Sequence, residues 1–241
     1  DASRRQDTST LLSFAGTTDP RTGLVWGGVL ATGVRAGLSL DNGGTLGFWS
    51  SFGVHELTGT NVQSNQRVRA MAGETWRIVN EEDRLFSLGL TAMDWHDTQD
   101  SGEFTFGQGG YYSPQTYRSL ALPVTWAQRY ARWSWAIRAS VFTSWSQTDA
   151  SPYFPTDPQL QASAGNPWYS TSSGPGSGYS FSAASEYQAT SRLFVGSRLE
   201  IERSPYYAPN TFLLYLRYAV GAAAAQPVAL PPNPVLPTSS F

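Results

Sequence analysis

Apolar and polar residues alternate along most of the chain. The clearest case is segment 133–145, in which the odd positions are almost all apolar and the even positions are mostly small or polar. Segments 85–95 and 193–202 divide in the same way. A period of two residues is typical of a strand with one apolar face, and the 3.6-residue period of an amphipathic helix is almost absent. The pattern therefore predicts an all-β fold.

This alternation predicts ten strands. They are expected at residues 11–16, 24–40, 45–55, 66–79, 85–95, 117–128, 133–145, 178–190, 193–202 and 211–220. Most of them reach the length of about 9–11 residues that a tilted membrane strand needs. Strands of soluble β-sandwiches, the competing all-β interpretation, are mostly about 5–6 residues long. Strand length therefore favours a transmembrane antiparallel β-barrel.

The predicted links between these strands alternate in length. Short links are expected at residues 41–44, 80–83, 130–132 and 190–192, and longer ones at 17–23, 56–65, 97–116, 147–177 and 204–210. Transmembrane barrels combine short periplasmic turns with long extracellular loops. The alternation is the strongest signal in the residues themselves, and it again favours the barrel over the sandwich.

Charged side chains follow the same division into two faces. Five arginines have the parity opposite to the apolar positions of their strands: Arg35, Arg69, Arg138, Arg198 and Arg217. A lipid-facing Arg near the membrane midplane costs about 2–4 kcal/mol, so these side chains are expected to face the lumen. Glu74 is an exception, because it shares parity with Trp76 and Ile78. Either a bulge shifts the register there, or Glu74 lies near a membrane interface.

Composition narrows the function classes. The chain has 241 residues, enough for one large domain, and all 16 of its basic residues are Arg. Charged residues make up 14%, against about 25% in a typical soluble domain. The net charge of −2 gives no basic field for nucleic acid, and the absence of Cys excludes disulfides and thiolate chemistry. No apolar run is long enough for a membrane-spanning helix. The chain opens on Asp1 without a basic or apolar leader segment, so any signal peptide or upstream domain is expected to lie outside this sequence.

Several segments resemble a known family. They are LVWGGV (24–29), HELTGTNVQSNQRVR (55–69), FGQGGYYSPQTYRSLALPVTW (106–126), YAPNTFLLYLRY (207–218) and LPPNPVLP (230–237). In this order they resemble the C-terminal region of cellulose synthase operon protein C, the BcsC family. The GQGGYYSPQ loop is the most specific part of the likeness, which covers nearly the whole chain.

The resemblance implies a passive outer-membrane channel that exports cellulose. In that family a periplasmic array of tetratricopeptide repeats precedes a sixteen-stranded barrel, so the ten strands here would be the last ten. The implied partners are the cellulose polymer, outer-membrane lipid, the repeat region upstream and an inner-membrane cellulose synthase complex. No cofactor, metal or catalytic residue is implied, so the chain is not expected to be an enzyme.

Two alternatives stay open at this point. One is an outer-membrane lipid hydrolase, which would need an activated Ser near His55 or His96. The other is a structural or secretion barrel for another exopolysaccharide or a passenger domain.

The loop inside the GQGGYYSPQ stretch is the candidate gate. Its residues are Gly109, Gly110, Tyr111, Tyr112, Ser113, Pro114 and Gln115. It lacks the Lys-Ser/Thr of a phosphate-binding loop, and no helix follows it. One interpretation is a structural extracellular loop, in which the glycines supply unusual backbone angles. The other is a gate that folds inward and offers the rings of Tyr111 and Tyr112 to pyranose C–H groups.

Residues expected to face the lumen form the candidate glucan path. They are Trp49, Trp95, Arg35, Arg67, Arg69, Arg138, Arg198, Glu200, Glu202 and Arg217. Some of these charges are expected to pair with one another and only hold the barrel's shape. Asp94, His96, Asp97 and Asp100 are a candidate cation site, and a solvated strand end explains these residues equally well.

The end of the chain differs from the rest. Residues 221–241 are rich in Ala and Pro, which favours polyproline II and cannot extend a sheet. We therefore divide the chain into a barrel region, 1–221, and a C-terminal tail, 222–241, expected on the periplasmic side. There the tail would guide polymer or dock a synthase partner.

Overall fold

The computed structural model describes residues 2–204 and 208–220. Its strands are β1 (Ala2–Gln6), β2 (Thr17–Thr18), β3 (Val25–Leu40), β4 (Leu46–Thr60), β5 (Val62–Asn80), β6 (Arg84–Asp97), β7 (Thr116–Tyr130), β8 (Trp133–Thr148), β9 (Ser151–Pro152), β10 (Trp168–Tyr169), β11 (Ser172–Gln188), β12 (Leu193–Arg203) and β13 (Asn210–Tyr218). Its helices are α1 (Leu11–Ala15) and α2 (Pro158–Ser163). No helix within these residues has the length and apolar character needed to cross a membrane.

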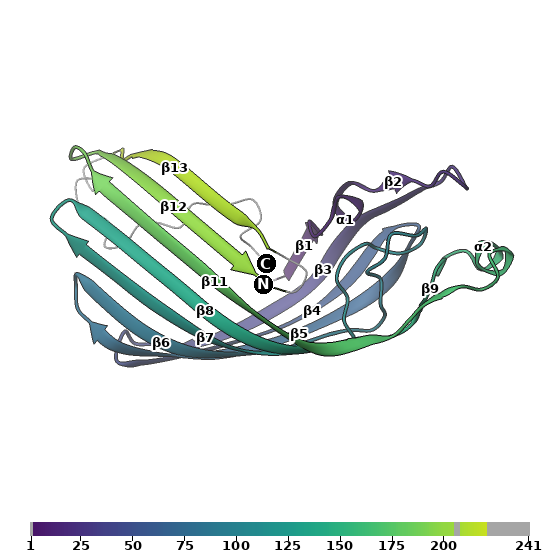
Figure 1. Ribbon diagram of the computed structural model, residues 1–241, viewed down its shortest axis with the longest axis horizontal. Helices are drawn as coiled ribbons and strands as arrows, with labels where there is room; N and C mark the ends of the chain where they lie inside the picture. The colour runs from purple at the N-terminus through teal and green to yellow at the C-terminus, as the bar shows by residue number, and fades with distance from the viewer. Residues whose placement is uncertain (1, 205–207, 221–241) are drawn as a thin grey trace.

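The long strands form one antiparallel sheet in the order β1-β3-β4-β5-β6-β7-β8-β11-β12-β13, with β2 paired to β3. Each strand lies beside its neighbour in sequence, apart from the small elements between them. The sheet curves steadily across this order into a trough (Figure 1). Its first and last strands, β1 and β13, are not paired with each other among the described residues. The all-β, barrel-like fold is confirmed, and closure of the barrel is not seen.

The strand register separates two faces, because direct cross-strand partners point the same way. Large exposed apolar side chains lie on one of them, which we call the outer face: Val34, Phe48, Phe52, Trp76, Leu120, Leu122, Trp126, Val141, Trp145, Tyr179, Val195, Phe212 and Leu214 are examples. The opposite face, the inner face, carries the arginines singled out above. The predicted two-sided pattern is therefore present from β3 to β13.

The predicted strand at residues 11–16 is wrong. Residues 11–15 form the helix α1, and the first strand is instead β1. Thr10 accepts a hydrogen bond from Ser13 N, and Ser13 Oγ accepts one from Thr10 N, which is a capping box. This capping motif decides the local structure, because six residues are too few for a period of two to be diagnostic.

The predicted long link at residues 56–65 is also wrong. Strands β4 and β5 run almost into each other, and Asn61 alone separates them, with φ of 49°. Asn tolerates this left-handed conformation better than most residues, so the turn can be tight. The polar residues that suggested a loop extend the two strands instead. The other long links, which run from residues 98 to 115 and from 149 to 171, lie at this same end of the sheet.

Glu74 lies on the outer face in an unbroken register, opposite Phe48 on β4 and Leu90 on β6. The register shifts of β5 lie elsewhere, between Leu57 and Gly59 on the β4 side and between Arg77 and Val79 on the β6 side. The bulge explanation therefore does not hold. The predicted tail, 222–241, lies outside the described residues.

Candidate functional site

The link between β6 and β7, residues 98–115 (loop 98–115 below), packs on the inner face near its end. Tyr111 of this loop forms an apolar cluster with Val29 and Leu57, together with Ala31 and Val62. Ala31 and Leu57 are cross-strand partners on the face that also carries Arg35. The loop is therefore folded toward the inside of the trough.

Backbone and side-chain hydrogen bonds fix the conformation of this loop. The amides of Gly109 and Gly110 both donate to Ser101 O, at 3.1 and 2.9 Å. Ser113 Oγ accepts from Ser101 N at 2.6 Å, and Gln115 Nε2 donates to Ser113 O at 3.0 Å. Gly110 has φ of 69°, a left-handed conformation that glycine adopts at low cost. These bonds make the glycine-rich stretch a folded unit.

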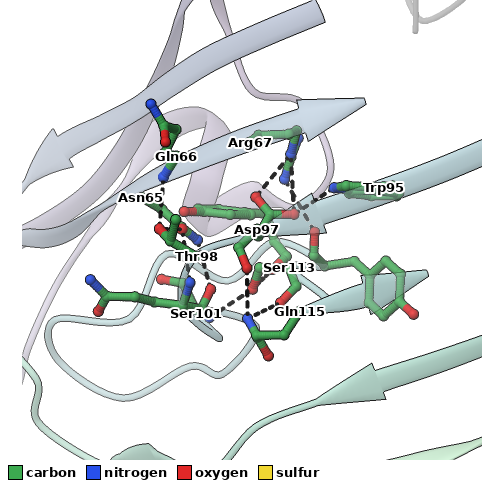
Figure 2. Close-up of polar contacts among 12 residues, drawn as sticks. Asn65, Gln66, Arg67, Trp95, Asp97, Thr98, Ser101, Ser113 and Gln115 are labelled. Carbon is green, nitrogen blue, oxygen red and sulfur yellow. Dashed lines mark hydrogen bonds and ion pairs between the residues drawn. The ribbon is translucent and has the colours of Figure 1, made fainter. Parts of the chain in front are cut away.

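A buried ion pair lies in the wall of the trough beneath the loop, between the adjacent strands β5 and β6 (Figure 2). Asp97, at the end of β6, is fully buried, and Arg67 Nε of β5 donates to its Oδ1 at 3.1 Å. Trp95 Nε1 donates to Asp97 Oδ2 at 2.5 Å, and Arg67 Nη2 donates to Tyr112 O at 3.2 Å. The guanidinium of Arg69 lies 3.9 Å from the centre of the Trp95 ring. Asp97 thus compensates the positive charge of Arg67, whose guanidinium lies directly under the loop.

The two tyrosines of the loop have different surroundings. Tyr111 is 1% exposed, so its ring cannot be offered to a polymer in this conformation, and that part of the gate interpretation is wrong. Burial raises the pKa of Tyr111 to about 12, and the phenol stays neutral at physiological pH. Tyr112 is 43% exposed and makes edge contacts with the rings of Trp95 and Tyr117. Of the two tyrosine rings, only that of Tyr112 is exposed enough to contact a polymer in this conformation.

Two other segments join loop 98–115 in a compact cap. We define the cap as residues 7–24, 98–115 and 149–171. Its core is the apolar cluster of Leu12, Phe106 and Phe154, which packs against Trp26 of β3. Polar contacts bridge the three segments: Thr10 Oγ1 donates to Gly110 O at 2.8 Å, and Gln108 Nε2 donates to Pro152 O at 2.8 Å. The cap therefore has its own small core and its own hydrogen-bond network.

The inner face, beneath the cap and beyond it, carries the residues predicted to line the lumen. Cross-strand pairing connects Arg35 with Gly53, Gly53 with Arg69, and Arg69 with Trp95. The same face includes Trp49, Arg67, Arg138, Arg198, Glu200, Glu202 and Arg217. The register thus brings all ten predicted residues to one surface.

Several of these charges are paired. Arg198 Nη2 lies 2.5 Å from Glu200 Oε1, and Arg217 Nη2 lies 2.5 Å from Glu186 Oε1. Glu186 is 2% exposed, and it also accepts a hydrogen bond from Tyr215. These pairs contribute to the shape of the wall. Such pairing was expected for some of the charges that face the lumen.

Aromatic rings lie across glycines on this inner face. Trp49 covers Gly73 of β5, Phe142 covers Gly178 of β11, and Tyr215 covers Gly196 of β12: a Cβ on any of these glycines would lie within 2.7 Å of the ring. Because only glycine permits such close approach, each ring rests against the backbone of the neighbouring strand.

Sequence reasoning missed Glu186, Phe142 and Tyr215 as wall residues. Their strands were identified, and parity alone would have placed all three on the inner face. Sequence reasoning also grouped Asp94 and His96 with Asp97 as a possible cation site. Strand parity puts Asp94 and His96 on the outer face and Asp97 on the inner face, so the structure does not bring this set together.

The fold and site define the class: a curved antiparallel sheet of barrel type, with an apolar outer face, a charged and aromatic inner face, and a loop-built cap at one end. A family model described as the C-terminus of cellulose synthase operon protein C matches residues 1–221. The chain belongs to that family.

Similar curated proteins carry the same description. The chain is 41% identical over 248 residues to cellulose synthase operon protein C of Escherichia coli K12, which covers 100% of this chain and 21% of that protein. It is 39% identical to the protein of that name from Pseudomonas fluorescens, over 96% of this chain and 18% of the relative. The Xanthomonas axonopodis relative is 36% identical over 93% of this chain and 16% of its own length. The chain spans about a fifth of the length of these relatives.

Proposed function

We propose that this chain forms part of the wall and the cap of an outer-membrane channel through which cellulose leaves a Gram-negative cell. The polymer would pass along the inner face, from the short-link end toward the cap. The channel would be a passive conduit, with movement of the polymer driven by an inner-membrane cellulose synthase. Its partners would include a periplasmic repeat region of the same protein.

The observation that carries this proposal is the separation of the two faces. The outer face presents large apolar side chains along the whole sheet, which suits contact with lipid. The inner face combines paired charges with aromatic rings, which suits a hydrated neutral polymer: hydroxyls can exchange hydrogen bonds with the charged groups, and ring faces can contact sugar C–H groups. Membership of a family described by its link to cellulose synthesis points to cellulose as that polymer.

The cap would be the closed state of the channel. Loop 98–115 lies on the inner face, held by the hydrogen bond from Arg67, the partner of Asp97, to Tyr112 O and by the two other cap segments. Tyr112, Trp95 and Tyr117 form a connected group of rings at the underside of the loop. We expect this group to contact the polymer first, and displacement of the loop to open the path.

The test is cellulose output from a host that lacks its own export channel and carries the complete gene. Output is measured by binding of a cellulose dye, with and without cellulase. Restored, cellulase-sensitive output is the expected result. A protein that is folded in the outer membrane but restores no output would contradict the proposal. A signal that cellulase does not remove would show that another glycan is exported.

A further inference from the structure

A groove crosses the outer face in the half of the sheet nearer the cap, on the side opposite to the inner face. It has a volume of about 740 Å³ and extends from β5 to β11. Two cross-strand rows of side chains line it. One contains Ala70, Asp94, Arg118 and Trp145, and the other contains Ala72, Ala92, Leu120 and Thr143. Three alanines, Ala70, Ala72 and Ala92, line the groove at positions where much of the outer face carries large apolar side chains.

The floor of this groove is mainly apolar. Ala72 and Ala92 are cross-strand partners, and their small side chains leave the space open. In the next row toward the short links, Leu90, Leu122 and Val141 are 40–58% exposed and stand up from the sheet. The groove is therefore a mainly apolar hollow that opens onto the exposed aliphatic side chains of the outer face, which suits a hydrocarbon chain better than a polar ligand.

An ion pair borders the groove on the side of the cap. Arg118 Nε donates to Asp94 Oδ2 at 2.9 Å, and the two side chains are 74% and 58% exposed. This contact uses only one nitrogen of the guanidinium. Its two terminal nitrogens have no partner among the residues that the structure describes. Asp94 thus holds the side chain while its charged end points away from the protein.

The position of this pair along the strands matches a membrane interface. Asp94 lies ten residues along β6 from Arg84, and Arg118 lies twelve residues along β7 from Tyr130. At about 3.3 Å per residue and a tilt of about 40°, these intervals span about 25–30 Å from the short-link end. The apolar band of a membrane barrel is about 25 Å tall. Arg118 and Trp145, its cross-strand partner, therefore stand at headgroup level on the side of the cap.

We propose that the groove is a binding site for a phosphorylated glycolipid of the outer leaflet. One acyl chain lies over Ala72 and Ala92, and a headgroup phosphate is held by the free end of Arg118. Two observations together select this occupant. The groove continues the apolar outer face into the depth of the hydrocarbon, and the unpartnered guanidinium nitrogens at its upper edge match an oxyanion. The proposal rests on the membrane position given under the proposed function.

Binding is measured on the purified full-length protein in detergent, titrated with bisphosphorylated lipopolysaccharide and examined by native mass spectrometry. Ala92→Leu fills the groove, and Arg118→Gln removes the cation. We expect each change to raise the half-saturating concentration about tenfold or more. Two matched controls should leave it within about twofold. Ala139→Leu enlarges another outer-face alanine outside the groove, and Arg84→Gln removes an outer-face arginine, paired with Glu81, at the opposite end.

Each contrary outcome overturns a stated part of the proposal. If Arg118→Gln weakens binding and Ala92→Leu does not, the groove holds no acyl chain. If dephosphorylated lipopolysaccharide binds as well as the intact glycolipid, the phosphate contact is wrong. If phosphatidylethanolamine, which also carries a phosphate, binds as well as the intact glycolipid, the groove takes phospholipid and the glycolipid assignment is wrong. Masses at multiples of the protein that disappear in Ala92→Leu would show that a second copy occupies the groove.

Cellulose output of the same variants separates this proposal from the proposed function. Output near the wild-type level is expected for Ala92→Leu and Arg118→Gln, because neither residue faces the lumen. A wild-type protein that binds the glycolipid and exports no cellulose would contradict the proposed function alone. Export without specific glycolipid binding would contradict only the groove.

Discussion

The cap and the wall of the trough use the same residue types but are held together by different kinds of contact. In the cap, short segments distant in sequence meet around buried polar groups, such as the fully buried Ser113, Gln108 and Asp97 beside it. In the wall around β12 and β13, a regular ladder supplies the backbone hydrogen bonds, and side-chain charges pair in place. The wall can therefore keep its shape when the cap is displaced, whereas the cap has one packed arrangement that is either formed or lost.

The largest effect is expected at the pair beneath the cap. Asp97→Ala leaves Arg67 buried without its counter-charge and should destabilise the closed cap by about 3–5 kcal/mol. Single-channel recordings of the full-length protein should then show a raised resting conductance. Glu81→Ala removes an exposed pair, Arg84–Glu81, and should cost at most about 1 kcal/mol with no change in conductance. A resting conductance that Asp97→Ala leaves unchanged would show that the pair does not hold the cap closed.

The buried carboxylate of the wall should behave differently. Glu186→Gln weakens the charge-assisted bonds to Arg217 and should lower the free energy of unfolding by about 1.5–3 kcal/mol. Thermal denaturation in detergent measures this loss. Because Glu186 lies in the wall, the resting conductance should stay at the wild-type value. An opened channel in this variant would mean that wall and cap are coupled.

Two glycines, one in the cap and one in a short link at the opposite end of the sheet, offer a smaller, matched comparison. Gly110→Ala places a Cβ at φ of 69° and within 2.9 Å of Leu12 Cδ2. The left-handed conformation alone costs about 1–2 kcal/mol. Gly43→Ala carries the same backbone cost, at φ of 78° with open space around it, in a short link at the other end. Both variants should be less stable in thermal denaturation, and only Gly110→Ala should raise the resting conductance.

The smallest change in stability is expected at the two tyrosines of the loop. Tyr112→Ala should lower the free energy of unfolding by less than about 1 kcal/mol, because the Tyr112 ring is half exposed. Cellulose output should nevertheless fall if this ring contacts the polymer. Tyr111→Phe should leave cellulose output unchanged, because the ring stays buried in its apolar cluster and does not contact the polymer. Unchanged output in Tyr112→Ala would remove the ring from the proposed glucan path.

Nine of the ten predicted strands were placed correctly because each one carries its own signal. A period of two along ten or more residues identifies the strand and its faces without any knowledge of its neighbours, as segment 133–145 shows. The same parity assigned Arg35, Arg69 and Arg138 to one surface. The misplaced strand at residues 11–16 and the missed turn at Asn61 lie where the pattern is short, and there a capping hydrogen bond or a single backbone angle decides.

The sequence by itself determined the all-β fold, the two faces and the resemblance to the family, since these depend on local periodicity and motif. Only the tertiary structure decided which residues of the cap work together. Thr10 meets Gly110 across 100 positions, Tyr111 is buried while its neighbour Tyr112 is exposed, and Asp97 selects Arg67 as its partner. The physical reason is that burial and charge pairing depend on which distant segments fold against each other, and no local pattern encodes that choice.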